Sequence, residues 1–252
     1  MTWPDGYLAE FHRERSGITE AVLTRTAHRD GRTTPYEWLL DAVPPQGGVL
    51  DLACGSAPMW PALRERPYVG VDTSPAELAL ARDRGAGPLL LADAGALPLA
   101  TGSTDTVVCA MALQIMTPLP GVLAEAGRVL PPGGRLVALV PDRGPLRGAD
   151  PLWLAGLLAA LGRTIGYPND AALRRPLPRL LGAAGLRLAD DRRRRFIYRP
   201  AGPADADLFL SSLYLPGLPA WRLRAARRWL RVAARVHAGL PVPLRRITAV
   251  RK

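Results

Sequence analysis

Residues 49–58, VLDLACGSAP, constrain this chain more than any other stretch of its sequence. The apolar run before Ala53 predicts a short buried strand, and Gly55 permits the backbone conformation of a tight turn. Ser56 and Pro58 are of the types that begin helices, as an N-cap and as a first helical residue. We therefore expect a strand, a turn and a helix, whose free backbone N–H groups attract the polar or charged part of a ligand.

The small residues of this turn bear on which ligand it favours. The dinucleotide fingerprint G-x-G-x-x-G requires three glycines, at the positions where this chain has Ala53, Gly55 and Pro58. Because only one of the three positions fits, a pyrophosphate site is poorly supported. The turn by itself predicts a ligand site without naming the ligand.

Strands and helices alternate along the rest of the chain. Residues 1–34 are expected to be largely helical. We expect further strands at 68–72, 88–93, 105–111, 135–140, 186–198 and 244–250, and helices at 36–42, 58–66, 75–84, 119–130, 151–164, 169–184, 204–214 and 220–238. This alternation predicts right-handed crossovers, a mostly parallel sheet and a ligand site outside the carboxyl ends of the strands.

Three carboxylates occur where such a site is expected. Asp51 lies in the first core strand, and Asp72 and Asp93 close the next two strands. Together with the run EAGRVLPPGG at residues 125–134, they follow the order and spacing of class I S-adenosylmethionine-dependent methyltransferases. The chain resembles the small-molecule type of that family, most clearly over residues 45–141.

The resemblance implies an α/β, Rossmann-like fold. Its seven-stranded sheet would be mostly parallel, with an antiparallel last strand and helices on both faces. It also implies a single domain over residues 1–252. Within it, residues 1–44 would form an N-terminal helical lid, residues 45–141 the cofactor-binding half, and residues 142–252 the substrate-side helices and closing strands.

S-adenosylmethionine is the cofactor that the resemblance implies, with S-adenosylhomocysteine as the product. Asp72 would accept hydrogen bonds from the ribose hydroxyls, Asp93 from the adenine amine, and Asp51 would hold the amino end of the methionine moiety. The family's first motif has glycine where Ala53 and Ala57 stand, so we expect their methyl groups to shift or weaken cofactor binding. The residues expected at the cofactor are Asp51, Ala53, Gly55, Asp72, Thr73, Asp93, Ala94 and Met111.

The segments expected over the strand ends are rich in leucine and aromatic residues, which predicts a largely apolar pocket. We expect O-, N- or C-methylation of a small, fairly apolar metabolite, with substrate contacts from Tyr7, Gln114, Trp153 and Tyr214. Gln114 stands where many relatives have histidine, and glutamine cannot act as a general base. The catalytic residues therefore stay open, with His12 and Tyr214 as candidates for a base.

Basic charge is concentrated in the second half of the chain. Residues 1–141 carry 11 basic and 15 acidic residues, whereas residues 142–252 carry 22 basic and 7 acidic. An RNA methyltransferase that uses this half is therefore one alternative, and a cofactor-binding protein without methyl transfer is another. We favour a small-molecule substrate, because the arginines also have the spacing of a solvated helix face, at Arg224, Arg227, Arg228, Arg231 and Arg235.

The remaining composition bounds the class of protein. Two cysteines are too few for a disulfide framework, and neither has neighbours that predict a metal site. The start of the chain lacks the features of a signal peptide, and the longest apolar stretch, residues 151–162, is well short of the roughly 20 residues of a membrane span. A soluble cytoplasmic protein is the expectation, and the sequence leaves its oligomeric state open.

Overall fold

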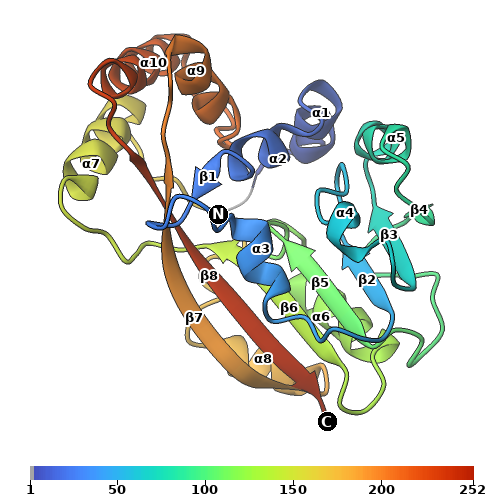
Figure 1. Cartoon of the computed structure of the whole chain (residues 1–252). Helices are drawn as coiled ribbons and strands as arrows, with labels where there is room; N and C mark the ends of the chain where they lie inside the picture. Colours follow the sequence, from blue (N-terminus) through green and yellow to red (C-terminus); the bar gives the residue numbers. More distant parts are fainter. Residues whose placement is uncertain (1–2) are drawn as a thin grey trace.

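The computed structural model describes residues 3–252, and these residues contain one eight-stranded sheet (Figure 1). The strands lie in the order β1-β7-β8-β6-β5-β2-β3-β4. Their bounds are β1 Thr26–Ala27, β2 Val49–Leu52, β3 Tyr68–Asp72, β4 Leu89–Leu91, β5 Thr106–Ala110, β6 Arg135–Pro141, β7 Leu186–Tyr198 and β8 Leu240–Arg251.

Ten helices accompany this sheet within the described residues. Their bounds are α1 Tyr7–Glu14, α2 Ile18–Leu23, α3 Pro35–Leu40, α4 Trp60–Leu63, α5 Pro75–Asp83, α6 Leu119–Val129, α7 Asp150–Leu161, α8 Leu177–Ala183, α9 Pro203–Ser211 and α10 Ala220–Arg235. None of these helices is long and apolar enough to cross a membrane.

The sheet has the direction pattern expected from the sequence. Strands β6, β5, β2, β3 and β4 are parallel neighbours, and β8 lies antiparallel between β6 and β7. The expected mostly parallel sheet with an antiparallel last strand is therefore confirmed. Parallel strands that share one direction bring their carboxyl ends to one edge of the sheet, where a ligand can bind.

The strand count differs from the expectation by one. The extra strand, β1, pairs Thr26 with Tyr198 and Ala27 with Ile197 at the outer end of β7. Residues 1–34 are therefore not wholly helical, and β7 is an edge strand only over the part that β1 does not cover. A two-residue strand has no alternating pattern by which the sequence could reveal it.

Two expected helices have less than half of their expected length in the structure, and prolines account for both. The helix expected at 58–66 is reduced to α4, in which Pro61 is the second residue and beyond which Pro67 follows. The helix expected at 169–184 begins only at Leu177, because Pro176 keeps the residue before it out of the helical conformation.

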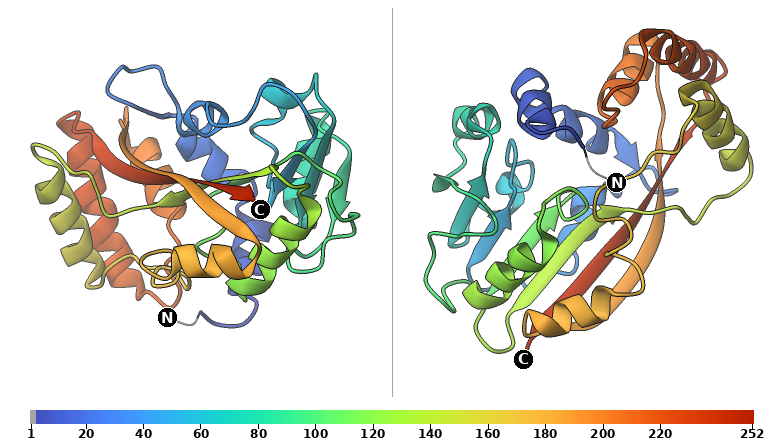
Figure 2. Two further views of the ribbon diagram at one scale, coloured as in Figure 1. Left: turned by 90° about the horizontal axis from the view of Figure 1, so that it is seen from below. Right: turned by 180° about the vertical axis from the view of Figure 1, so that it is seen from behind.

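Helices cover both faces of the sheet (Figure 2). On one face, α6 and α8 bury Leu123 and Leu181 against the central strands, and on the other α3 buries Trp38 and Leu39. Helices α7, α9 and α10 pack on one another around a third apolar cluster that includes Leu230. Helices α1 and α2 lie near the carboxyl ends of β2, β3 and β5 (Figure 1).

Candidate functional site

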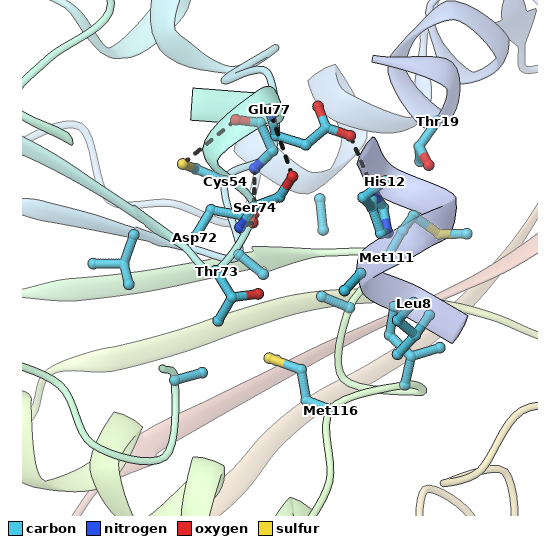
Figure 3. A pocket seen from close by; sticks show the side chains of 18 of the residues that line it. Leu8, His12, Thr19, Cys54, Asp72, Thr73, Ser74, Glu77, Met111 and Met116 are labelled. Atoms are coloured by element: carbon cyan, nitrogen blue, oxygen red, sulfur yellow. Dashed lines mark hydrogen bonds and ion pairs between the residues drawn. The ribbon is translucent and has the colours of Figure 1, made fainter. Parts of the chain in front are cut away.

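A cavity of about 1010 Å³ opens at the carboxyl ends of the parallel strands (Figure 3). Its walls are the turns that follow β2, β3, β4 and β5, and α1 closes one side. All eight residues expected at the cofactor line it, namely Asp51, Ala53, Gly55, Asp72, Thr73, Asp93, Ala94 and Met111. The sheet topology brings these residues together from four separate segments of the chain.

Asp72 is fixed by two backbone groups at the end of β3. Its Oδ2 accepts a hydrogen bond from the N–H of Gly55 at 2.8 Å, and its Oδ1 accepts one from the N–H of Ser74 at 2.8 Å. Burial raises the pKa of the Asp72 carboxyl above its ordinary value, although these two N–H donors oppose the shift. The carboxylate therefore ties the turn after β2 to the start of α5 and still borders the cavity.

Asp51 is a buried carboxylate with one unused oxygen. Its side chain is 0% exposed, and its Oδ2 accepts a hydrogen bond from the Tyr68 hydroxyl at 3.0 Å. Its Oδ1 has no hydrogen-bond partner among the described residues. Burial raises the pKa of Asp51 to about 7. A buried carboxylate with one unpaired oxygen is suited to bind a cationic group of a ligand.

The backbone of the turn after β2 takes the conformation that favours glycine. Gly55 has a φ of 54°, but Ala53 at 55° and Ala57 at 53° share this left-handed region. Ala53 lines the cavity, whereas Ala57 is buried against Ala81 beneath α5. A direct effect of the methyl group on cofactor binding therefore stays a prediction for Ala53, whereas the turn points the Ala57 side chain into the core.

Asp93 closes the far end of the cavity. Its Oδ1 accepts a hydrogen bond from the N–H of Gly95 at 2.6 Å, so the carboxylate also shapes its own turn. The next residue, Ala94, is buried. The backbone at this position borders the same cavity as Asp72.

Ser74 and Glu77 have the residue types and spacing of a capping box at the start of α5, and the structure gives the Glu77 carboxylate a different environment. The Ser74 hydroxyl accepts a hydrogen bond from the Glu77 N–H at 3.3 Å, as expected for an N-cap. The Glu77 carboxylate instead accepts hydrogen bonds from the N–H of Gly17 at 2.9 Å and from His12 Nδ1 at 3.0 Å (Figure 3). His12 Nε2 lies 3.0 Å from the Tyr214 hydroxyl. Sequence reasoning missed Glu77 as a site residue, because its capping position gave a sufficient local explanation.

A second cavity of about 580 Å³ adjoins the first. Helices α7 and α9 supply apolar side chains to it, including Trp153, Leu157 and Phe209. The two cavities share Thr19, Met111 and Tyr214 as lining residues. The smaller cavity therefore reaches the larger one at the side where α2, the end of β5 and the segment after α9 meet.

The residues expected to contact substrate are divided between the two cavities. Tyr7 lines the larger cavity and its hydroxyl accepts a hydrogen bond from the N–H of Leu215 at 2.9 Å. Trp153 and Gln114 line the smaller one, and Tyr214 lines both. Gln114 is only 1% exposed, and its side-chain amide donates to the Met111 carbonyl at 2.6 Å.

Many arginines of the basic second half form ion pairs within the fold. On β7, Arg193 pairs with Asp142 at 2.7 Å. Arg195, on the same strand, pairs with the buried Asp150. On α10, Arg231 pairs with Asp207 of α9 at 2.6 Å. These ion pairs neutralise part of the positive charge of the second half, so less of that charge is available to an anionic partner. The described residues contain no group of three or more His, Cys, Asp or Glu side chains that could hold a metal ion.

The parallel sheet, the glycine-like turn after β2 and the carboxylates at successive strand ends define a Rossmann-like nucleoside-binding protein. Residues 50–138 match the family described as "Methyltransferase domain". With that match and its fold, residues 50–138 form a class I S-adenosylmethionine-dependent methyltransferase domain. S-adenosylmethionine is accordingly the cofactor of this class, and the unused Asp51 oxygen and the cavity beside it fit a ligand that carries an ammonium group.

Two curated relatives match parts of the chain. The malonyl-[acyl-carrier protein] O-methyltransferase of Alcanivorax borkumensis is 41% identical over 117 residues, covering 43% of this chain and 40% of that protein. The ubiquinone/menaquinone biosynthesis C-methyltransferase of Acidiphilium cryptum is 35% identical over 141 residues, covering 50% and 56%. The chain therefore matches about half the length of these relatives.

Two solved structures share the fold at low sequence identity. A [4+2]-cyclase has a TM-score of 0.61 at 17% identity, and the match covers 100% of this chain and 98% of the cyclase. Geranyl diphosphate C-methyltransferase from Streptomyces coelicolor has a TM-score of 0.51 at 19% identity, covering 86% and 79%. At these identities the similarity concerns the fold alone.

Proposed function

We propose that this protein transfers the methyl group of S-adenosylmethionine to an oxygen, nitrogen or carbon atom of a small, fairly apolar metabolite. One observation carries the proposal: the carboxylate-lined cavity at the strand ends adjoins a smaller cavity with apolar side chains from α7 and α9, and Thr19, Met111 and Tyr214 border both. Methyl transfer is a displacement that needs donor and acceptor aligned across such a junction.

Each carboxylate has a specific task in this proposal. Asp72 accepts hydrogen bonds from the ribose hydroxyls, because its carboxylate is held at the turn and borders the cavity. Asp93 accepts from the adenine amine and the Ala94 N–H donates to a ring nitrogen. Asp51 pairs with the amino group of the methionine moiety through its unused oxygen. Gly55 lets the backbone approach the ligand closely.

The acceptor occupies the smaller cavity in this proposal. Apolar side chains of α7 and α9 bury the body of the acceptor, and Trp153 supplies a large aromatic surface. Tyr7 borders the larger cavity from α1, and Gln114 holds the backbone at Met111 rather than exchanging a proton. The cofactor supplies the methyl group, and the chain's own residues bind, orient and keep water out.

Calorimetry with S-adenosylhomocysteine tests the cofactor site. We expect binding to wild-type protein and a loss of at least tenfold in affinity for Asp72→Ala, because that substitution removes the carboxylate aimed at the ribose. Asp83→Ala is the matched control, since Asp83 lies exposed at the end of α5 outside both cavities. Equal affinity in wild type and Asp72→Ala would refute the ribose assignment.

Turnover tests the reaction itself. Purified protein is incubated with S-adenosylmethionine and a panel of apolar phenols, amines and carbon acids, and release of S-adenosylhomocysteine is measured. Turnover of members of this panel supports the proposal. Turnover of structured RNA alone, with affinity that falls steeply with salt, supports the RNA alternative instead.

A second function has one observation in its favour. The [4+2]-cyclase matches the whole chain in fold, so this fold also occurs in a protein that is named for a cyclisation. A cofactor-binding protein without methyl transfer would bind S-adenosylmethionine and never release S-adenosylhomocysteine.

We place the protein in the cytoplasm, where buried free thiols such as Cys54 and Cys109 stay reduced.

A further inference from the structure

Glu77 is a buried carboxylate that the cofactor assignments leave unused. Its side chain is 5% exposed and faces the larger cavity from α5. One oxygen is 3.0 Å from His12 Nδ1 and the other accepts from the Gly17 N–H at 2.9 Å. Both partners belong to the N-terminal segment, so this segment and α5, which are distant in sequence, meet at the carboxylate; Figure 3 shows Glu77 beside His12.

The hydrogen bonds around His12 fix the direction in which a proton can move. An ionised carboxylate only accepts, so His12 carries its proton on Nδ1 and donates it to Glu77. Nε2 then has a free electron pair and accepts from the Tyr214 hydroxyl at 3.0 Å. Tyr214 therefore donates to His12, and His12 donates to the Glu77 carboxylate, so both hydrogen bonds run toward Glu77.

The first member of this chain stands at the junction of the two cavities. Tyr214 lines both, and its ring is buried among Phe11, Trp3 and Tyr167. Burial raises the pKa of the Tyr214 hydroxyl, so the group stays protonated at neutral pH. It can accept a proton from a neighbouring molecule only by passing its own proton to His12.

We propose that Tyr214, His12 and Glu77 form a proton relay that deprotonates the methyl acceptor, which must then carry a hydrogen on the atom that is methylated. As the bond from that atom to the methyl carbon forms and the methyl–sulfur bond breaks, the acceptor's proton passes to the Tyr214 oxygen. The original Tyr214 proton passes to His12 Nε2, and Glu77 stabilises the resulting imidazolium. Tyr214 is the catalytic residue, and His12 and Glu77 are positioning residues.

The relay rests on the proposed methyl transfer and gives it a pH dependence. Glu77 from α5 and Asp72 from β3 face His12 as anions, and Tyr7, Tyr167 and Tyr214 are the neighbouring phenols. Protonation of Nε2 would fill the acceptor site for the Tyr214 proton. The rate should therefore fall toward acid pH.

The tautomer of His12 is the test that needs no substrate. Long-range ¹H–¹⁵N spectra of histidine-labelled protein at pH 8 report which ring nitrogen carries the proton, and His12→Gln identifies the His12 signals. We expect the neutral Nδ1–H form, and a shift of the His12 Nε2 signal in Tyr214→Phe but not in Tyr198→Phe. Tyr198 is the control because its buried hydroxyl donates to the Asp205 carbonyl outside both cavities. A proton on Nε2 overturns the relay.

Kinetics with an acceptor found in the turnover panel gives the second test. We expect Tyr214→Phe to lower kcat by about 10²–10⁴-fold, the range of general acid–base catalysis, with S-adenosylhomocysteine affinity changed less than threefold. Glu77→Gln and His12→Gln should lower kcat by smaller factors, and His12→Gln should also remove the fall in rate toward acid pH. Full activity in Tyr214→Phe overturns the relay and leaves methyl transfer intact. A protein that binds no S-adenosylhomocysteine overturns the methyltransferase proposal and the relay's role in it, while the tautomer still decides whether Tyr214 donates to His12 and His12 to Glu77.

Discussion

Tyr68 donates its hydroxyl proton to Oδ2 of Asp51 at 3.0 Å, and this is the hydrogen bond that the buried Asp51 carboxylate makes in the described protein. Both side chains belong to adjacent parallel strands, β2 and β3. The hydrogen bond stabilises the ionised form, but burial dominates and raises the pKa of Asp51 to about 7. The free energy of unfolding of the ligand-free protein should therefore depend on pH through the Asp51 carboxyl.

Asp51→Asn is expected to stabilise the ligand-free protein most at alkaline pH. The pKa of Asp51 is raised in the folded state, so its favourable contribution is present at acid pH and is lost as the pH rises toward 7. Asparagine has no charge to bury, so the free energy of unfolding of the variant, relative to wild type, should rise by about 2–3 kcal/mol between pH 5 and pH 8, at about 1.4 kcal/mol per pKa unit. Urea unfolding at both pH values measures this difference, and a difference that does not change with pH contradicts the raised pKa of Asp51.

The same variant should lose cofactor affinity. Binding of an ammonium group favours the ionised carboxylate, so wild-type affinity for S-adenosylhomocysteine should fall by up to tenfold per pH unit below about 7. Asp51→Asn should bind more weakly at pH 8 and show a flatter pH dependence. Titration calorimetry at three pH values measures both effects, and identical pH dependence in the two proteins would show that Asp51 does not face the ammonium group.

Ala53 and Ala57 occupy backbone conformations that disfavour alanine. A left-handed conformation costs an L-residue about 1–2 kcal/mol relative to its ordinary region. Ala53→Gly should therefore raise the free energy of unfolding by about 1 kcal/mol. Ala57→Gly should be close to neutral, because glycine also loses a methyl group buried against Ala81. Thermal unfolding distinguishes them, with Ala100→Gly as an exposed control outside the turn.

The cofactor half of the fold was predictable because short-range patterns determine it. The bounds of β3 follow from its apolar run, and Ser74 is the helix cap that its type and position predict. The antiparallel last strand came from the family resemblance and is confirmed by β8. Both kinds of prediction depend on residues near one another in sequence or on a known order of strands.

The contacts of Glu77 were not predictable in this way. Its partners His12 and Gly17 lie 65 and 60 residues away, and the relay partner Tyr214 is 202 residues from His12. Its position in the sequence predicts that Glu77 caps its own helix. Because α1 packs against α5, the Glu77 carboxylate instead accepts hydrogen bonds from the N-terminal segment. For the same reason the sequence could nominate His12 and Tyr214 but could not show that they touch.

Arg195→Gln should destabilise the protein much more than Arg192→Gln, although both residues belong to the same arginine run on β7. Arg195 pairs with Asp150, which is 2% exposed, so its removal leaves a buried carboxylate without its counter-ion and should cost about 2–4 kcal/mol. Arg192 pairs with Asp190 near the surface, where an ion pair contributes about 0–1 kcal/mol. Urea unfolding of both variants measures the difference. Adding Asp150→Asn to Arg195→Gln should recover part of the loss, and equal effects of the two single variants would contradict a buried pair.

Gly127 and Gly121 lie on the same helix, α6, and alanine should have opposite effects at the two positions. A Cβ at Gly127 would lie 2.2 Å from the carbonyl oxygen of Ala184, so α6 and the end of α8 would have to separate. Overpacking of this kind costs about 1–3 kcal/mol, which exceeds the gain in helix propensity. At Gly121 the nearest atom to an added Cβ is 3.8 Å away, so alanine should stabilise the helix by up to about 1 kcal/mol. Thermal unfolding of the two variants decides the matter: if Gly127→Ala is as stable as Gly121→Ala, α6 and α8 do not pack as closely as this structure has them.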